Sequence, residues 1–386
     1  MKYSKRYRRE SLKTKYLIFA SQDYDKANHK GLWDKLANEL ENDVVVVNIP
    51  ADKIVSRVKG HADRIADARA GAKKYGERLT VIRPMLTLRA ELVPKCLYKS
   101  LSKELWRDIE EKVPDIKDCF LNVIVYNAFW VEILKKSRNN MKIAYYLFDE
   151  VRRNGNDNSI NKRRYAEDEF ACRNSDVVFT MTRVLAESRK EYNDNIIVMG
   201  NGADLPEKEY SGEKYTSSAA FVGNFRNWVD KKMLKEMISS MPEILFVFVG
   251  SVEEDMREYL DSLLKNYPNT LFYGKVPKAE INSLYSAFDC VIIPYLDSEF
   301  IRATRPIKIV ESVLAGTPVV TVPMDGYDEC EFIRFAKDAE EFSREIRYCV
   351  EHAIDRESRE YKSFVENNTW SAKAKQIDAV MKKRQK

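Results

Sequence analysis

The segment from Pro306 to Val322 constrains the fold more than any other stretch of this chain. Pro306 suits the start of a helix, because its missing N–H group would have no partner there. Gly316 suits the left-handed backbone position that follows the end of a helix. The run from Thr317 to Val322 is apolar and β-branched, which is typical of a strand buried on both faces. The sequence therefore predicts a helix that leads directly into a central strand of a parallel sheet.

Two charged residues, Lys308 and Glu311, fall on one face of this predicted helix. The first turn of a helix presents free N–H groups and the positive end of the helix dipole. A lysine beside such a terminus suits a diphosphate, and a carboxylate one turn later can accept hydrogen bonds from ribose hydroxyls. The same pair also fits an exposed ion pair that binds no ligand.

Short apolar runs alternate with helical patterns along the whole chain, which is typical of βαβ units and parallel sheets. At 386 residues the chain is long enough for two domains of this α/β class. The predicted strands lie on both sides of a polar linker at 205–218: at 15–21, 43–49, 79–83, 122–126, 142–147, 176–180 and 195–199 before it, and at 219–223, 244–250, 270–273, 290–295 and 319–322 after it.

The composition excludes several classes of protein. No apolar run approaches the roughly 18 residues that span a bilayer, and the N-terminus lacks the apolar core of a signal peptide, so we expect a cytosolic chain. The six cysteines are scattered without a C-x-x-C pair, which predicts free thiols in a reducing compartment. Only three histidines are present, which argues against a histidine-based metal centre.

The positive charge is concentrated at the N-terminus. Residues 1–15 carry a charge of +6, whereas the whole chain carries +5. Such a tail could contact anionic lipid head groups, at about 1 kcal/mol per charge, or remain a solvated leader. The near-neutral remainder argues against a nucleic-acid partner. Residues 85–112 form a basic amphipathic stretch, which suits an ordinary helix packed on the domain or one that lies on a membrane surface.

Several polar residues are predicted at the carboxyl ends of strands in the first half, where open α/β sheets bind ligands. Asp149 and Glu150 follow the strand at 142–147; they suit work on a substrate hydroxyl, although Asp149 would equally suit a helix cap. His29 lies in the loop after the first strand, either facing a substrate or as a plain loop residue. Asp23 and Asp25 in the same loop resemble a metal-binding D-x-D only superficially, and we predict no metal site there.

The run P-x-K-x-x-E-x-x-x-A-G-x-P-V-V at 306–320 resembles the donor-site motif of retaining glycosyltransferases with the GT-B fold, in the large family four. It looks most like the branch that builds bacterial teichuronic acid and other surface polysaccharides. The resemblance implies that Lys308 contacts the donor diphosphate and that Glu311 binds the nucleotide ribose. Many members carry a further glutamate where this chain has Ala303. Contacts with the sugar or the diphosphate are therefore expected from Arg302, Thr304 or Arg305.

Other segments resemble this family more weakly. Tyr145, Tyr146, Asp149 and Glu150 are similar to its Y-D-x-x-D-D element, which implies that Asp149 or Glu150 acts on the acceptor hydroxyl, with Tyr146 on the acceptor side. The position of His29 in the loop after the first strand would place it on the same side. Arg226, at the first turn of the second domain, matches an arginine that clamps the diphosphate. The turn at 200–204 is similar to the family's connector between domains, and 367–370 to the start of its C-terminal helix.

The resemblance implies two Rossmann-like domains facing each other across a cleft. The expected parts are a basic tail (1–14), an acceptor domain (15–205), a donor domain (206–365) and a C-terminal helix returning to the first domain (366–386). The implied reaction transfers a sugar, favouring a UDP-sugar, to a hydroxyl of a glycan or lipid-linked glycan, without metal or other cofactor. In membrane-associated relatives an element comparable to 85–112 docks on the inner leaflet. A sugar-nucleotide epimerase and a non-catalytic nucleotide-sugar-binding scaffold are the alternatives.

Overall fold

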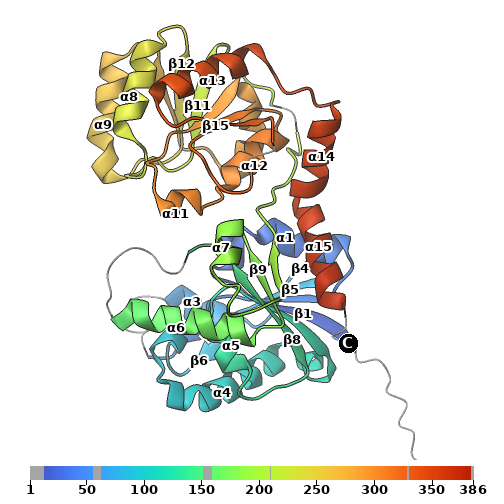
Figure 1. Cartoon of the computed structure of the whole chain (residues 1–386). Helices are drawn as coiled ribbons and strands as arrows, with labels where there is room; N and C mark the ends of the chain where they lie inside the picture. The colour runs from blue at the N-terminus through green and yellow to red at the C-terminus, as the bar shows by residue number, and fades with distance from the viewer. Residues whose placement is uncertain (1–12, 55–61, 151–158, 209, 328–329, 384–386) are drawn as a thin grey trace, which may run out of the picture. The chain divides into compact units, whose positions relative to one another are not determined.

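The computed structural model describes residues 13–54, 62–150, 159–208, 210–327 and 330–383 (Figure 1). The basic tail at 1–12 lies outside them. The chain divides into two compact units. Unit 1 contains the described residues up to Thr180, together with 186–197 and the residues from Ala374 onward. Unit 2 contains 181–185 and 198–373.

Unit 1 is built on an eight-stranded sheet with the order β10-β9-β8-β7-β1-β2-β5-β4. Strands β9, β8, β7, β1, β2 and β5 run parallel, while β4 is antiparallel to β5 at the edge. The strands are β1 (Thr14–Phe19), β2 (Val44–Val47), β4 (Lys73–Tyr75), β5 (Leu79–Ile82), β7 (Phe120–Val125), β8 (Met141–Leu147), β9 (Val177–Thr180) and β10 (Ile196–Val198). Strand β1 lies between β2 and β7. The chain adds β2 and β5 on one side of β1 and then β7, β8, β9 and β10 on the other.

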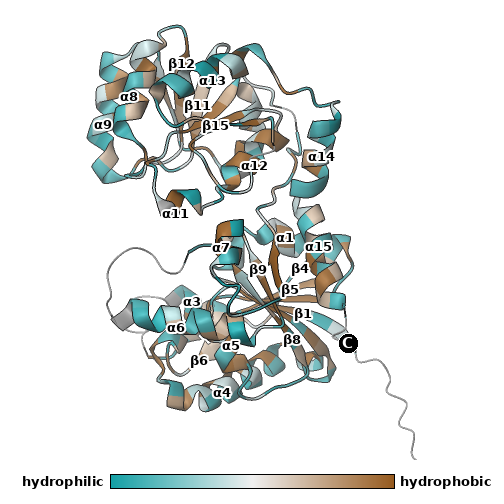
Figure 2. Ribbon diagram, in the orientation of Figure 1, coloured by the Kyte–Doolittle hydropathy of each residue, from teal (hydrophilic) through white to brown (hydrophobic). Residues whose placement is uncertain are grey.

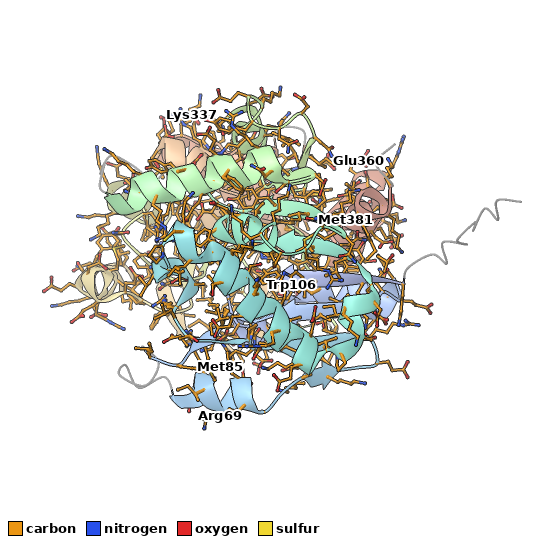
Figure 3. The ribbon with its side chains drawn as sticks, turned by 90° about the horizontal axis from the view of Figure 1, so that it is seen from below. Arg69, Met85, Trp106, Lys337, Glu360 and Met381 are labelled. Atoms are coloured by element: carbon orange, nitrogen blue, oxygen red, sulfur yellow. The ribbon has the colours of Figure 1, made fainter. Side chains whose placement is uncertain are left out.

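The helices of unit 1 follow the strands in the order that a βαβ pattern predicts. They are α1 (Lys30–Asp34), continued by a π-helical segment (Lys35–Glu39), then α3 (Ala62–Arg69), α4 (Tyr98–Lys112), α5 (Phe129–Leu134), α6 (Ser159–Asn174) and α7 (Arg183–Glu187), which begins within unit 2. The apolar face of α4 is buried and includes Trp106 (Figure 3). The Trp106 ring lies 5.0 Å from the Arg138 guanidinium carbon. This helix therefore packs its apolar face within the unit.

The sheet of unit 2 has six strands in the order β13-β12-β11-β14-β15-β16, all parallel. They are β11 (Ser218–Val222), β12 (Leu245–Val249), β13 (Thr270–Gly274), β14 (Cys290–Ile293), β15 (Val319–Thr321) and β16 (Ile333–Phe335). The helices are α8 (Lys231–Ser240), α9 (Glu254–Asn266), α10 (Lys278–Leu284), α11 (Glu299–Arg302), α12 (Ile307–Leu314), α13 (Ala339–Glu351) and α14 (Arg359–Asn368).

Hydropathy follows this layering. Figure 2 shows apolar colour on the strands of both sheets and polar colour on the outer faces of helices such as α6 and α9. The central strands β1, β8, β11 and β14 each have a nearly continuous buried run. Such continuous burial is expected for parallel strands covered by helices on both faces.

The last helix, α15 (Trp370–Lys382), begins in unit 2 and ends in unit 1. Its final carbonyl groups are capped by Lys142 of β8, whose Nζ donates to the carbonyl oxygens of Val380 at 2.7 Å and Lys383 at 2.8 Å. The Asp378 carboxylate accepts a hydrogen bond from Tyr16 of β1 at 2.9 Å. The end of this helix is therefore tied to two strands of the first sheet.

The predicted strands are all present, but three short strand features were not predicted. The edge strand β4 is polar and half exposed, so it lacks the apolar run that signals a buried strand. Strand β16 is three residues long, and β3 (Ala51–Asp52) pairs with β6 (Met85–Leu86) over two residues only. Each of these strands is too short or too polar to show a period of two.

Candidate functional site

The helix α12 has the predicted form and places Lys308 at the carboxyl ends of the central strands of the second sheet. It begins at Ile307 after Pro306, and Gly316 just beyond its end has a φ of +83°. The Lys308 ammonium donates a hydrogen bond to the Tyr295 hydroxyl at 3.0 Å and lies 4.6 Å from the Phe221 ring centroid. Phe221 belongs to β11, and Tyr295 lies just beyond β14, the neighbouring strand. In open α/β sheets, ligands bind where the connections on either side of such a strand pair diverge.

Glycines at the ends of β11 and β12 leave room beside Lys308. Gly223 has a φ of +140°, and a Cβ atom there would lie 2.6 Å from Lys308 Nζ. Gly250 has a φ of +130°, and its Cβ would lie 2.0 Å from the Gly223 carbonyl oxygen. The position of Gly223 therefore favours glycine for its backbone conformation, and that of Gly250 requires glycine for both backbone conformation and space. The result is a turn whose bare backbone adjoins an ammonium group.

Glu311 lies one turn after Lys308 on α12, and its Oε2 accepts a hydrogen bond from the Tyr285 hydroxyl at 3.0 Å. Tyr285 is buried, and burial followed by the negative charge of Glu311 raises its pKa well above the ordinary value. The hydroxyl therefore stays protonated and keeps its proton directed at the carboxylate. Lys308 and Glu311 are each held by a tyrosine, which fixes their side chains.

Arg226 lies at the first turn of unit 2, as predicted, and is partly exposed. Its Nε donates to Glu253 Oε1 at 2.6 Å, and its guanidinium carbon lies 4.4 Å from the Trp228 ring centroid. Asn224 also donates to Glu253, at 3.3 Å. The Glu253 carboxylate and the Trp228 ring together fix the position of the Arg226 guanidinium, three residues after Gly223.

The residues around Ala303 differ in exposure. Ala303 is buried, whereas Arg302 is largely exposed and donates to both carboxylate oxygens of Asp297, at 2.7 and 2.5 Å. The Arg302 ion pair lowers the pKa of Asp297. Thr304 directs its hydroxyl to the Ile301 carbonyl oxygen at 2.8 Å. Arg302 and Thr304 thus hold the short loop that precedes α12.

Arg305 lies in a polar cluster rather than in solvent. It donates to the Gly326 carbonyl oxygen at 2.9 Å and stacks on the Tyr327 ring at 4.3 Å, while Asn201 donates to its backbone carbonyl oxygen. Lys373 is buried nearby, and burial followed by the charge of Arg305 lowers its pKa to about 8. Among the described residues, no ion pair joins Lys373 to a carboxylate. Arg305 therefore holds the loop before α12 against the connector at 200–202.

In unit 1, His29 and Tyr146 come together in a cluster of aromatic rings. The His29 ring lies 5.1 Å from the Tyr126 ring and 5.5 Å from that of Tyr146. Tyr146 is buried and stacks on Tyr126 at 4.9 Å. Trp33 donates from its indole nitrogen to the Tyr126 hydroxyl at 3.1 Å. The structure therefore places His29 beside Tyr146, as a half-buried ring on a fully buried one.

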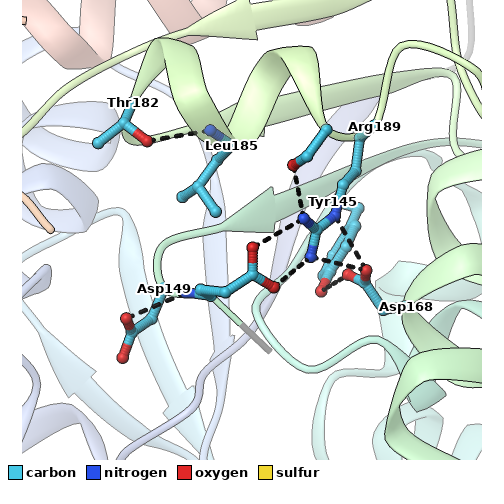
Figure 4. Close-up of polar contacts among 8 residues, drawn as sticks. Tyr145, Asp149, Asp168, Thr182, Leu185 and Arg189 are labelled. Carbon is cyan, nitrogen blue, oxygen red and sulfur yellow. Dashed lines mark hydrogen bonds and ion pairs between the residues drawn. The ribbon is translucent and has the colours of Figure 1, made fainter. Parts of the chain in front are cut away.

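Asp149 and Glu150 follow β8, and Glu150 belongs to a buried polar network (Figure 4). Both Glu150 carboxylate oxygens accept from Arg189, at 2.7 and 2.9 Å. On its other side Arg189 donates to Asp168 Oδ2 at 3.1 Å, and Tyr145 donates to Asp168 Oδ1 at 2.9 Å. The amide N–H of Glu150 donates to Asp149 Oδ1 at 3.0 Å.

The electrostatics of this network follow from burial. Arg189 and Asp168 have exposures of 0%. Burial raises the pKa of Asp168, although Arg189 and Tyr145 act in the opposite direction. Burial alone would lower the pKa of Arg189, but the hydrogen bond and charge of Glu150, with the charge of Asp168, outweigh it and raise that pKa. The guanidinium therefore stays charged between its carboxylates.

Asp149 and Glu150 line a cavity of about 590 Å³ within unit 1. Its other lining residues come from 91–92, from 126–129 after β7, from β8 with Phe148 after it, and from α6. They include Asn127, Arg164 and Glu167. Asn127 also lines a smaller cavity of about 180 Å³ that extends to the ends of β1 and β2. Cavities of several hundred Å³ with a few convergent polar groups are typical of small-molecule sites.

Asp23 and Asp25 do not converge on a common point. Arg83 donates to Asp23 Oδ1 at 2.9 Å, and Tyr75 donates to Asp25 Oδ1 at 3.0 Å. Within the described parts of the chain, no group of three or more histidine, cysteine, aspartate or glutamate side chains is arranged to hold a metal ion.

Sequence reasoning missed Arg189, Asp168 and Tyr285. Arg189 and Asp168 lie in charged stretches that look like solvated helix faces. The bonds that join them to each other, to Tyr145 and to Glu150 all span at least 21 positions. Tyr285 follows an apolar helical run and looks like an ordinary core residue. Only the fold reveals that these residues hold Glu150 and Glu311.

Residues 216–352 match the family described as glycosyl transferases group 1, so this part of unit 2 is a glycosyltransferase group 1 domain. Over 100 residues the chain is 31% identical to the putative teichuronic acid biosynthesis glycosyltransferase TuaH of Bacillus subtilis (strain 168). That alignment covers 26% of this chain and 25% of the relative, so the chain spans about a quarter of its length.

The solved structures that share the fold include two complexes with UDP. Anabaena Alr3699/HepE, in complex with UDP and glucose, has a TM-score of 0.62 and 15% identity, over 97% of this chain and 100% of that chain. A variant of S. aureus TarM, in complex with fondaparinux, alpha-GlcNAc-glycerol and UDP, has a TM-score of 0.63 and 8% identity, over 96% and 100%. The predicted α/β fold of the GT-B class is confirmed.

Across the residues that the structure describes, no helix has both the length and the apolar character needed to cross a bilayer.

Proposed function

We propose that this chain, with its glycosyltransferase group 1 domain at 216–352, transfers a sugar from a nucleotide-diphosphate donor to a hydroxyl of a glycan or lipid-linked glycan. The observation that carries the proposal is the placement of Lys308 against Gly223, at the edge of the sheet of that domain. A UDP-sugar is the favoured donor, supported by the UDP in the HepE and TarM complexes. The relative named for teichuronic acid biosynthesis supports a surface polysaccharide as the product.

The donor half of the reaction is assigned to unit 2. Breaking the bond between the sugar and the diphosphate leaves negative charge on the leaving group. The Lys308 ammonium, the Arg226 guanidinium and the N–H groups at the start of α12 would stabilise that charge from fixed positions. Glu311, held by Tyr285, would accept hydrogen bonds from the ribose hydroxyls. Because these groups supply positive charge themselves, we propose a reaction that needs no metal.

The loop before α12 would contact the transferred sugar. Ala303 is buried and short, so it leaves this contact to Arg302 and Thr304 on either side. Arg305 would act by holding the loop in place, because its guanidinium binds the Gly326 carbonyl oxygen and stacks on Tyr327. Retention of the anomeric configuration is proposed from the resemblance of residues 306–320 to retaining enzymes.

The acceptor half is assigned to the cavity of about 590 Å³ in unit 1. Carboxylates at the carboxyl end of β8 suit the orientation of an acceptor hydroxyl, and aromatic rings such as Phe148 suit the apolar faces of sugars. His29 and Tyr146 would support this wall from behind, since Tyr146 is buried.

Two experiments test the proposal. The first is calorimetric titration of the parent with UDP, GDP, ADP and dTDP, with and without EDTA, and of Glu311→Ala with the same nucleotides. Selective binding of UDP that survives EDTA and is lost in the variant supports the donor site. If none of the four binds, the donor assignment is wrong.

The second experiment screens UDP-sugars against a panel of octyl glycosides and measures UDP release. Release that depends on the acceptor, with a new glycosidic product, supports a transferase. Conversion of the UDP-sugar into its epimer without any acceptor would instead support an epimerase. Nucleotide binding with no turnover on any donor or acceptor would support a scaffold.

A further inference from the structure

Asp149 and Glu150 are adjacent carboxylates at the end of β8, and the second of them is held in a guanidinium fork (Figure 4). Glu150 has both oxygens bound to one guanidinium, with Arg189 NH2 at 2.7 Å from Oε1 and NH1 at 2.9 Å from Oε2. The Glu150 side chain is 21% exposed, whereas Arg189 has no exposure. Asp149 carries the hydrogen bond from the Glu150 amide on its Oδ1, at 3.0 Å.

Arg189 is itself fixed from the opposite side. Its Nε donates to Asp168 Oδ2 at 3.1 Å, and Asp168 Oδ1 accepts from Tyr145 at 2.9 Å. Asp168 is completely buried, so moving the guanidinium would leave a buried carboxylate without its counter-ion, which is strongly unfavourable. Tyr145 belongs to β8, the strand that leads to Asp149. The network therefore holds this strand end both through Tyr145 and through Glu150.

A carboxylate with both oxygens on a buried guanidinium is a poor partner for a substrate hydroxyl. A further hydrogen bond would compete with a bidentate, charge-assisted pair, and swinging the side chain away would uncover the Arg189 charge. The network still has a consequence for its neighbour, because it fixes the Glu150 backbone, and that backbone N–H binds Asp149.

We propose that Arg189 is a positioning residue for the acceptor side and that it divides the roles of the two carboxylates. Glu150 holds the strand end, and Asp149 is the residue that contacts the acceptor hydroxyl. The path runs from Arg189 through the Glu150 carboxylate and amide to Asp149. The inference rests on the proposed transferase function, and it deepens that function by choosing between two residues that the sequence left equivalent.

The first test measures turnover with the donor and octyl glycoside that release UDP fastest in the screen above. Asp149→Asn is expected to lower kcat by at least about 100-fold, the scale of a group acting on the reacting hydroxyl. Arg189→Lys keeps the charge but cannot form the fork, so kcat/KM for the acceptor is expected to fall about 10- to 100-fold. Glu150→Gln keeps a carbonyl oxygen for Arg189 and is expected to lose less than Asp149→Asn.

The control for Arg189→Lys is Arg173→Lys on α6, an exposed arginine paired with Glu169 on the same helix. It is expected to leave turnover unchanged. Calorimetric affinity for UDP is expected to stay at the parental value in all four variants, because the donor residues lie in unit 2. A variant that is misfolded as a whole would lose both acceptor kcat/KM and affinity for UDP. If the parent itself does not bind UDP, the proposed function fails.

The second test needs no substrate. Exposed carboxylates react with a carbodiimide and glycine ethyl ester, and mass spectrometry locates the label. Glu150 is expected to react much more slowly than the exposed Glu191 in the parent, and to approach its rate in Arg189→Lys. The proposal is overturned if Glu150 already reacts like Glu191 in the parent. It is equally overturned if Glu150→Gln abolishes turnover while Arg189→Lys and Asp149→Asn retain it.

Discussion

The two sheets share the order of six parallel strands, but the residues at the carboxyl ends of these strands differ in chemistry. The edge of unit 2 is made of bare backbone at Gly223 and Gly250 with an ammonium group beside it. The edge of unit 1 is made of stacked aromatic rings and of carboxylates, one of which is held in a guanidinium fork. Backbone amides and a cation suit a phosphate, whereas rings and carboxylates suit hydroxyl-rich sugars. The same fold can thus be specialised for either substrate by the residues that follow its strands.

The comparison extends to how each unit buries a cation. Unit 1 buries Arg189 with Asp168 and Glu150 as partners. Unit 2 buries Lys373 beside Arg305, with no ion pair to a carboxylate among the described residues. The surroundings of Arg189 therefore stabilise its charged form, whereas those of Lys373 destabilise its charged form. The following predictions test these contrasts.

The largest effect is expected from Asp168→Ala in unit 1. It removes the Asp168 carboxylate from Arg189 and leaves that of Glu150, and breaking a buried pair costs about 3–5 kcal/mol. Hydrogen exchange followed by mass spectrometry should show faster exchange in peptides of β8 and α6, but not in those of α8 and α9. Glu169→Ala, at the exposed neighbouring position, is the control. Unchanged exchange in β8 would mean that the pair of Arg189 and Asp168 does not stabilise unit 1.

Lys373 should make stability depend on pH. Its pKa falls from the ordinary 10.5 to about 8 in the folded chain, so between these values only the unfolded chain holds the proton. The unfolded state thus binds more protons, and stability rises with pH across this window, by about 3 kcal/mol in total. Lys373→Met should therefore be more stable than the parent at pH 7, with the difference shrinking towards pH 10.

Urea unfolding at several pH values checks this expectation. The control is Lys375→Met, because Lys375 has an exposed side chain paired with Glu39. Its difference from the parent should stay small at every pH. A constant difference between parent and Lys373→Met would contradict the lowered pKa.

Lys308→Ala should affect binding rather than folding, in contrast to Asp168→Ala. A hydrogen bond to a charged group contributes roughly 1.5–3 kcal/mol, so the Kd for UDP should rise by about 10- to 150-fold. Titration calorimetry measures the affinity, and thermal unfolding should give a Tm close to that of the parent. Lys232→Ala, at an exposed position of α8, serves as the control. Parental affinity in Lys308→Ala would remove the lysine from the donor site.

The smallest effect is expected from Tyr285→Phe. Losing the hydroxyl that holds Glu311 should weaken UDP binding by about 0.5–1.5 kcal/mol, less than the loss of a direct charged contact, because Tyr285 acts on the ligand only through Glu311. Tyr361→Phe is a matched control, because the Tyr361 hydroxyl binds the Leu314 carbonyl oxygen at the opposite end of α12. If both variants weaken binding equally, the effect comes from α12 as a whole and not from Glu311.

The sequence predicted those features that depend on neighbouring residues. The helix α12 was predicted because Pro306 and Gly316 mark its ends, and the buried strands because their apolar runs are continuous. The partners of the charged residues were not predicted, since Tyr285 reaches Glu311 and Arg189 reaches Glu150 only through the tertiary fold. For the same reason the sequence did not distinguish Asp149 from Glu150, whereas the structure shows that Arg189 binds both carboxylate oxygens of Glu150.

The anchoring of α15 by Lys142 has a consequence for biosynthesis. Strand β8 is made early, but the carbonyl groups that its lysine binds belong to Val380 and Lys383, which leave the ribosome only after all of unit 2. Unit 1 therefore lacks the last part of α15 while unit 2 is being synthesised. It can complete its packing only when the residues after 373 have been made. Folding in the cell should accordingly end, as well as begin, with the first unit.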